Sequence, residues 1–246
     1  MYDVTHFTVK EMTECCAAVR ELGAGAASME EAANRVVRYF FEHLVVQPSG
    51  RRACALVRFF KTHPFASLGP TLQAYAKLLL PTPPPSGAVQ CLTLLATAGE
   101  RPEWNARAQS KGHQAIPLVS QKMAEEAPMI ANLIRQLGVP IASVVEPDRR
   151  LLLDLSQKTF NVFHVAEAVG SPYIPAQQDF VIPYGVQSVL GLGGVLPLGG
   201  LITVILFSRC PISREVAVLF RPIALAVKLA VLPFEEAVFA DDTPAR

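Results

Sequence analysis

The spacing of apolar residues predicts two helices at the start of the chain. Residues 9–22 and 29–44 each carry an apolar stripe at steps of three and four residues, which is typical of an amphipathic helix. Each stripe follows a capping-box pattern, in which a hydroxyl and a carboxylate satisfy free backbone N–H groups. The two boxes are Thr8 with Glu11 and Ser28 with Glu31. The short GAGAAS turn between the helices predicts an αα-hairpin.

A further helix is predicted at the other end of the chain, from Ser213 to about Phe234. Its apolar residues follow a heptad stripe, and a second apolar stripe lies on another face. A helix that is apolar on two faces is expected to be buried on both. We expect one face to pack on a sheet and the other to meet the N-terminal helices or a second subunit. The residues assigned to a two-fold homodimer interface are Met12, Val19, Phe220, Ile223 and Val227.

Between these helices the pattern changes to short apolar runs. Residues 53–60 and 89–97 are expected to be strands, and residues 70–80 a short helix that begins at a proline. The sequence PTPPPSG at 81–87 is expected to be a stiff loop, because proline cannot donate to a sheet. Residues 120–137 are expected to be helical and broken or kinked near Pro128.

One uncharged stretch, residues 186–207, is long enough to cross a bilayer as a helix. It contains Gly199-Gly200 between two runs rich in Val, Ile and Leu, which is typical of a β-hairpin. We therefore predict adjacent strands at 189–195 and 201–207, and no membrane insertion. Helical structure across this stretch would contradict both expectations.

The order of elements fits one mixed fold of helices and strands, without a composition break or a repeat. We predict an α/β (α+β) fold with an antiparallel sheet of five or six strands and flanking helices. The N-terminal helical hairpin is assigned to residues 1–48, the main domain to 49–236, and a linker or disordered tail to 237–246.

Charge and cysteine usage narrow the classes of function. The 246 residues include 22 basic and 21 acidic side chains without a basic stripe, which gives no indication of nucleic-acid binding. The five cysteines are odd in number, form no CxxC, and follow an N-terminus without an apolar export signal. This usage is typical of reduced thiols, so we expect a cytoplasmic protein.

Four segments are similar to segments in the N-terminal sensory regions of bacterial two-component histidine kinases. They are RFFKTHPF, CLTLLATAGE, GSPYIPAQ and FVIPYGVQSVLGLGG. The order of elements from Gly185 onward resembles the C-terminal half of a GAF domain, and the resemblance covers about residues 50–234. It implies a GAF-like fold that binds a small ligand and relays the signal through its terminal helices to a partner or a kinase module. The ligand and any cofactor are unknown, because the features of bilin-binding and cyclic-nucleotide-binding members are absent from the sequence.

The candidate ligand-binding residues are one cation, one histidine and four aromatic side chains. Arg58 is a lone charge in an apolar strand and shares a face with Leu56 and Phe60. It either extends to solvent or meets an acidic group, which a ligand could supply. The other candidates, which surround the proline-rich segment before residue 186, are Phe163, His164, Tyr173, Phe180 and Tyr184.

Catalysis and metal binding have little support in the sequence. His164 is interpreted as a histidine bonded to backbone in preference to a haem ligand, since no histidine pair has metal-binding spacing. No GxGxxG, Walker A or GxSxG motif is present, so we do not expect an enzyme. The alternatives to a sensory domain are a dimerisation or scaffold module without a ligand, and a redox or haem sensor.

Overall fold

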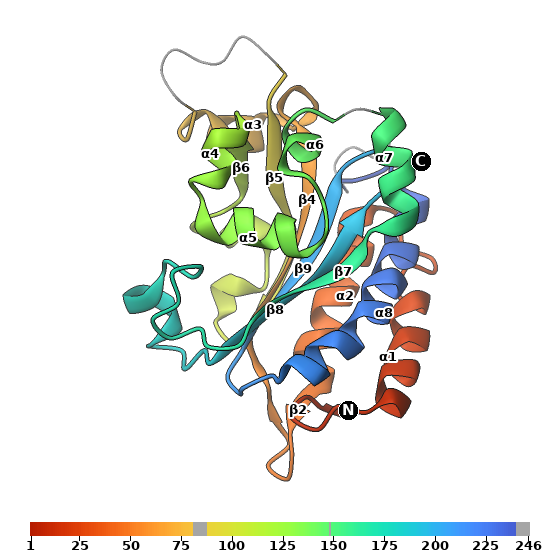
Figure 1. The fold of residues 1–246 in the computed structure, drawn as a ribbon, viewed down its shortest axis with the longest axis vertical. Helices are drawn as coiled ribbons and strands as arrows, with labels where there is room; N and C mark the ends of the chain where they lie inside the picture. The colour runs from red at the N-terminus through yellow and green to blue at the C-terminus, as the bar shows by residue number, and fades with distance from the viewer. Residues whose placement is uncertain (81–87, 148, 240–246) are drawn as a thin grey trace.

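A single antiparallel sheet forms the centre of the molecule (Figure 1). The computed structural model describes residues 1–80, 88–147 and 149–239, with side chains at all of these except 149–153. The sheet has six strands in the order β6-β5-β4-β9-β8-β7, and every neighbouring pair is antiparallel. The strands are β4 (Cys54–Pro64), β5 (Gln90–Gly99), β6 (Ala115–Leu118), β7 (Phe160–Val165), β8 (Ser188–Val195) and β9 (Leu201–Ser208). The predicted mixed fold with five or six strands is confirmed.

The predicted hairpin is present as β8 and β9, so residues 186–207 do not form a membrane helix. Gly199 and Gly200 make the turn with φ angles of 96° and 106°, which favour glycine. Inside β8, a Cβ atom on Gly193 would lie 2.0 Å from the carbonyl oxygen of Ile202 on β9. Gly199 and Gly200 therefore permit the turn, and Gly193 permits the close approach of the two strands.

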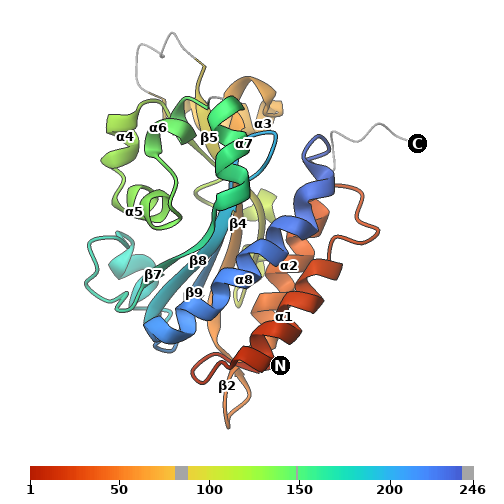
Figure 2. The same ribbon diagram turned by 45° about the vertical axis from the view of Figure 1, so that its right-hand side comes forward.

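Three helices cover one face of the sheet (Figure 2). They are α1 (Val9–Glu21), α2 (Met29–His43) and α8 (Arg214–Val231). Helix α2 packs on β4 and β5, α8 packs on β7 and β8, and α1 packs on α8. Thr8 and Glu11 form the predicted capping box, whereas the Glu31 carboxylate accepts the N–H of Ala27, one residue before the expected Ser28. The two N-terminal helices were predicted correctly, and their main contacts are with the sheet and α8.

Shorter helices and an irregular segment lie on the other face of the sheet. Helices α4 (Gln121–Glu125) and α5 (Pro128–Gln136) are separated at Pro128, as predicted, and α6 (Ile141–Val145) follows them. The segment between β7 and β8 contains a single turn of π-helix, at Gln177–Val181. The described part of this region also has α7 (Arg149–Lys158) before β7. Helix α3 (Pro70–Lys77) lies against β6, and its buried residues Leu72 and Ala76 belong to the core on the side of α1, α2 and α8.

Several small elements were not predicted. Three short strands, β1 (Tyr2–Asp3), β2 (Leu44–Val46) and β3 (Arg51–Arg52), form a separate sheet. The edge strand β6 was also missed, because four residues that include a proline carry too little periodicity. The predicted loop at 81–87 lies outside the described residues.

The start of the predicted C-terminal tail is packed against the fold. The carbonyl groups of Ala237 and Val238 accept the N–H groups of Met29 and Glu30 at 2.9 Å, and Val238 and Phe239 are buried. Residues 237–239 are therefore not a linker, because they satisfy free donors at the start of α2. The remaining residues of that segment, 240–246, lie outside the described residues.

The residues assigned to a dimer interface need correction. Val19, Phe220, Ile223 and Val227 are fully buried within the single chain, and Met12 packs against the same core. The reason is that α1 covers the second apolar face of α8 from within the chain. The four buried side chains are not available to a second subunit, Met12 is only partly buried, and dimerisation itself remains a prediction.

One helix among the described residues, Arg214–Phe234, is long and apolar enough to cross a membrane by length and composition. Of its most apolar stretch, 56% is buried inside the molecule. Its packing on β7, β8 and α1 accounts for the apolar composition.

Candidate functional site

Arg58 lies in the middle of β4, on the sheet face opposite α1, α2 and α8. Strand alternation places Leu56 and Phe60 beside it in the second apolar core, while Val57 and Phe59 face the helices. Nη2 of Arg58 donates to the hydroxyl oxygen of Ser110 at 3.3 Å. No carboxylate of the described residues lies within ion-pair distance of its guanidinium group.

Burial governs the electrostatics of this cation. Loss of hydration lowers the pKa of the Arg58 guanidinium to about 10, so the group remains charged at neutral pH. The side chain is only partly exposed, and its Nε atom has no hydrogen-bond partner among the described residues. A charge held in this way lacks the counterion that usually accompanies a buried cation.

Two threonines add further unpaired polar atoms to the same face. Thr97 on β5 pairs directly with Arg58 in the sheet register, and Thr203 on β9 pairs with Phe60. Both residues are fully buried, and neither hydroxyl has a partner in the described part of the chain. A buried polar group without a partner costs about 1–3 kcal/mol. We call Arg58, Thr97 and Thr203 the polar centre.

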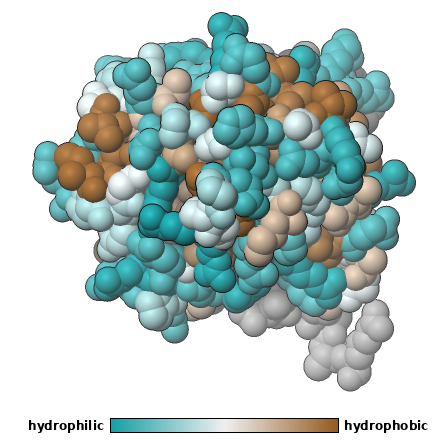
Figure 3. Space-filling model, turned by 90° about the horizontal axis from the view of Figure 1, so that it is seen from below, coloured by the Kyte–Doolittle hydropathy of each residue, from teal (hydrophilic) through white to brown (hydrophobic). Residues whose placement is uncertain are grey.

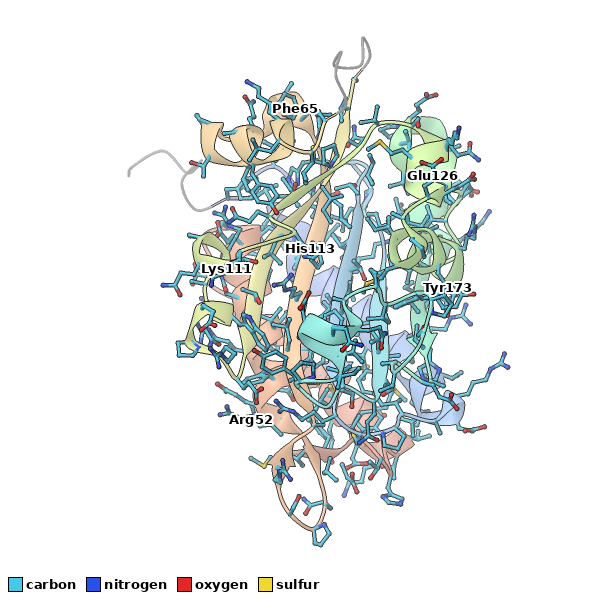
Figure 4. All side chains as sticks on the ribbon, turned by 90° about the vertical axis from the view of Figure 1, so that its left-hand side faces the viewer. Arg52, Phe65, Lys111, His113, Glu126 and Tyr173 are labelled. Carbon is cyan, nitrogen blue, oxygen red and sulfur yellow. The ribbon has the colours of Figure 1, made fainter. Side chains whose placement is uncertain are left out.

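The segment after β5 supplies polar groups around the polar centre. The Ser110 hydroxyl donates to the carbonyl oxygen of Gly112 at 2.8 Å, and the His113 N–H donates to the hydroxyl of Tyr75 at 2.9 Å. His113 has a left-handed φ of 61° and lies over the middle of the sheet in Figure 4. Desolvation and the nearby Arg58 charge lower the pKa of His113, so its imidazole is neutral at neutral pH.

An aromatic cluster borders the polar centre on one side. The ring centroids of Trp104 and Tyr184 are 4.6 Å apart, those of Trp104 and Phe180 5.6 Å, and those of Phe180 and Phe207 5.0 Å. Phe207 pairs with Leu56 in the sheet register, two residues along β4 from Arg58. Rings of this kind supply apolar contact area beside a charged group.

The predicted site residues fall into separate places. Arg58, Phe180 and Tyr184 lie on the face just described, and Phe163 is fully buried in the core beneath it. His164 and Tyr173 instead line an open groove of about 430 Å³ between α5 and the segment after β7. The Nε2 atom of His164 lies 2.9 Å from the Ile212 carbonyl oxygen, which matches its interpretation as a backbone-bonded histidine.

A second cavity, of about 420 Å³, was not predicted. It lies between the end of β4, the β8–β9 turn and the residues after α8, and its lining includes Lys61, His63 and Glu235. The available signal was Lys61 and His63 at alternate positions of an apolar strand, which places them on one face. Of the charged residues in this strand, only Arg58 was predicted as a site residue.

The described residues contain no group of three or more His, Cys, Asp or Glu side chains that could hold a metal ion. Burial raises the pKa of Cys15 to about 12 and that of Cys91 to about 11. It also raises the pKa of Cys16, Cys54 and Cys210. Because the thiolate is the reactive form, these thiols give the redox-sensor alternative no support.

Comparison with known proteins gives a distant structural likeness. No protein-family model matches the chain, and no curated protein matches it. One solved structure is the GAF domain from a phosphoenolpyruvate-protein phosphotransferase of Coxiella burnetii, at TM-score 0.43 and 13% identity, covering 92% of this chain and 94% of that chain. A bacteriophytochrome from R. palustris matches at TM-score 0.42 and 10% identity, covering 94% of this chain and 40% of the other.

The photosensory core module of the Stigmatella aurantiaca phytochrome matches at TM-score 0.39 and 10% identity, covering 94% of this chain and 38% of that chain. With TM-scores below 0.5 and identities of 13% or less, these matches assign neither a family nor a function to the chain.

Proposed function

We propose that this protein is a signal-input domain whose sheet face binds a small anionic molecule through Arg58. The observation that supports it most is a partly exposed arginine, on a central strand, without a carboxylate partner among the described residues. A guanidinium group binds carboxylate or phosphate oxygens with two parallel hydrogen bonds. An anion at Arg58 supplies the missing counterion and an acceptor for its Nε–H.

The surroundings of Arg58 define the kind of ligand. Ser110 and the neutral His113 offer uncharged hydrogen-bonding groups, and the aromatic cluster offers apolar contact. A molecule with an anionic group and an apolar or aromatic body matches this arrangement. The Nε atom and the two threonine hydroxyls are covered in the structure, so side chains of the rim must shift for a ligand to reach them.

The terminal helices are the proposed route of the signal. Helix α8 packs on β8, β8 pairs with β9, and β9 pairs with β4, which carries Arg58. A change in strand position at Arg58 therefore reaches α8 through a continuous set of packed elements. A homodimer or a downstream kinase module is the proposed receiver of this change.

Native mass spectrometry of the purified chain after incubation with a bacterial small-molecule extract tests the binding proposal. The expected result is a bound species of defined mass on the wild-type chain that is absent from Arg58→Met. The matched control is Arg51→Met, which removes an exposed arginine and is expected to retain the bound species. A wild-type spectrum without any bound molecule, or the same species on Arg58→Met, would contradict the proposal and favour the scaffold alternative.

A further inference from the structure

The cavity of about 420 Å³ lies at the end of β4 and shares no lining residue with the polar centre. Its lining combines the end of β4, the β8–β9 turn and the segment that follows α8. The polar lining residues used below are Lys61, His63, Glu235 and Glu236, and the apolar wall includes Phe239. Gly200 has no side chain here, and a Cβ atom at this position would lie 3.4 Å from the Nζ atom of Lys61.

Lys61 is a buried amine without a counterion among the described residues. The residue is 6% exposed, and none of the ion pairs in the described chain includes it. Its Nζ atom lies 3.3 Å from the Thr62 carbonyl oxygen and 3.4 Å from the Nε2 atom of His63. Burial lowers the pKa of Lys61 to about 8, against the attraction of Glu235. About a tenth of the Lys61 side chain is therefore the neutral, nucleophilic amine at pH 7, which is far more than for an exposed lysine.

Two groups, His63 and Glu235, interact with the Lys61 amine by hydrogen bonding and by charge. The His63 imidazole is buried and packs against the Phe239 ring with centroids 5.2 Å apart and an interplanar angle of 32°, and its Nδ1 atom has no partner in the described part of the chain. Burial and the Lys61 charge lower the pKa of His63 to about 3, so the ring is a neutral base. Burial raises the pKa of the Glu235 carboxyl, which accepts the Leu198 N–H at 3.0 Å. The other charges that act on Glu235 are Lys228 and Glu236.

We propose that Lys61 is a nucleophilic lysine that forms a reversible imine with a small aldehyde or ketone in this cavity. The Nζ lone pair forms a bond to the carbonyl carbon, and the carbonyl electron pair moves to oxygen, which takes up a proton. The neutral His63 ring is the hydrogen-bond acceptor beside Nζ, and the Glu235 carboxylate takes the proton that the nitrogen loses and returns it to the oxygen. Water then leaves with the former carbonyl oxygen, so that one amine and one carbonyl give one C=N bond and one water. No oxidant or reductant takes part in this step.

Reductive trapping on the full chain tests this assignment. The protein is treated at pH 7 with low-millimolar propanal and sodium cyanoborohydride, which reduces only the imine, and the labelling rate of each lysine is read by peptide mass spectrometry. We expect Lys61 to be labelled at least about tenfold faster than the exposed Lys10 and Lys158, because more of its amine is neutral. The rate at Lys61 should also level off above about pH 8, whereas the rates at Lys10 and Lys158 continue to rise.

Two variants distinguish a chemical role of Lys61 from an effect on folding, because labelling of Lys10 serves as the internal reference in each. Lys61→Met replaces the amine with an apolar chain of similar length and should abolish the fast label while Lys10 reacts as before. Glu235→Gln removes a carboxylate that raises the pKa of Lys61, so labelling at Lys61 should level off at a lower pH while Lys10 is unchanged. Labelling of Lys61 no faster than Lys10 in the folded wild-type chain, or a pH profile that matches the exposed lysines, would overturn the proposal. Neither result would bear on the Arg58 site.

Discussion

Three polar side chains, Arg58, Thr97 and Thr203, lie among apolar residues in the middle of the sheet face opposite α1, α2 and α8. Strand alternation predicts that Arg58 shares a face with Leu56 and Phe60, but not which side of the sheet this is, since β4 is apolar on both faces. The sequence could not predict that no carboxylate of the described residues lies within ion-pair distance of Arg58. The surroundings of Arg58 come from distant parts of the sequence: Ser110, its hydrogen-bond partner among the described residues, is 52 residues away along the chain.

Thr97→Val tests whether the buried hydroxyl is unpaired in the free protein. Valine has nearly the shape of threonine, so removal of an unsatisfied hydroxyl should leave the free energy of unfolding unchanged or raise it by about 1 kcal/mol. The matched control is Ser188→Ala, which removes a buried hydroxyl that donates to the Cys210 carbonyl oxygen at 2.8 Å and should cost about 1 kcal/mol. Urea denaturation measures both, and an equal loss in the two variants would disprove the assignment.

His63 gives the fold a specific sensitivity to acid. The unfolded chain protonates this imidazole below about pH 6.5, whereas the folded chain does so only near a pKa of about 3. The unfolded state therefore binds more protons between these values, and stability falls as the pH is lowered from 6.5 toward 3.

His63→Phe should remove this loss, because phenylalanine can still stack on Phe239 and does not titrate. Between pH 6.5 and 5, the free energy of unfolding should fall less in the variant than in the wild type by about 2 kcal/mol. His6→Asn changes an exposed histidine and should retain the wild-type slope. Identical slopes for His63→Phe and the wild type, measured by urea denaturation at each pH, would show that His63 is not held neutral.

At the scale of elements, long apolar runs with clear turn residues were predictable, whereas short or irregular elements were not. The β8–β9 hairpin followed from Gly199-Gly200 between two β-rich runs, and the break between α4 and α5 followed from Pro128. The edge strand β6 and the π-turn at Gln177–Val181 have no such local signal. Their form depends on contacts with β5 and with the aromatic cluster, which are set by the tertiary fold.

Gly193→Ala tests the close approach of β8 and β9. The added methyl group would lie 2.0 Å from the Ile202 carbonyl oxygen, so the two central strands must separate and the chain should lose its cooperative unfolding transition. Gly112→Ala is the control, since no heavy atom lies within 4 Å of its added Cβ and its stability should change by less than about 1 kcal/mol. Far-UV circular dichroism with thermal denaturation compares the two. A folded Gly193→Ala with wild-type stability would contradict the strand register.

At the scale of the whole molecule, the helices on one face leave an apolar surface uncovered. The inner stripe of α8 packs on the sheet and α1, but its outer face exposes Val218 (54%) and Leu229 (41%), with Pro222 and Leu225 between them. In Figure 3, apolar atoms gather on the side of α8 at the upper right and around the segment after β7 at the left. The sequence correctly indicated two apolar faces on this helix, but it could not show that α1 covers one of them.

Val218→Asp tests the predicted homodimer without disturbing the core. If the outer face of α8 forms the two-fold contact, the substitution should yield a monomer with near wild-type stability, because like charges meet at a symmetric contact. Phe220→Ala is the contrasting variant, since its ring is fully buried and the loss should be about 3–5 kcal/mol in any oligomeric state. Sedimentation velocity at tens of micromolar distinguishes the outcomes, and a monomeric wild-type chain would end the dimer prediction.

The measurement that tests the central claim most directly is thermal denaturation in the presence of small anions. The wild-type chain, Arg58→Met and Arg51→Met are each melted with acetate, benzoate, phenylacetate or phenyl phosphate at several concentrations. An anion that binds the folded state raises the melting temperature with its concentration. We predict that an aromatic anion raises it in the wild type and in Arg51→Met by several degrees, and does not raise it in Arg58→Met. Equal shifts in all three chains, or no shift with any of these anions, would contradict an anion site at Arg58.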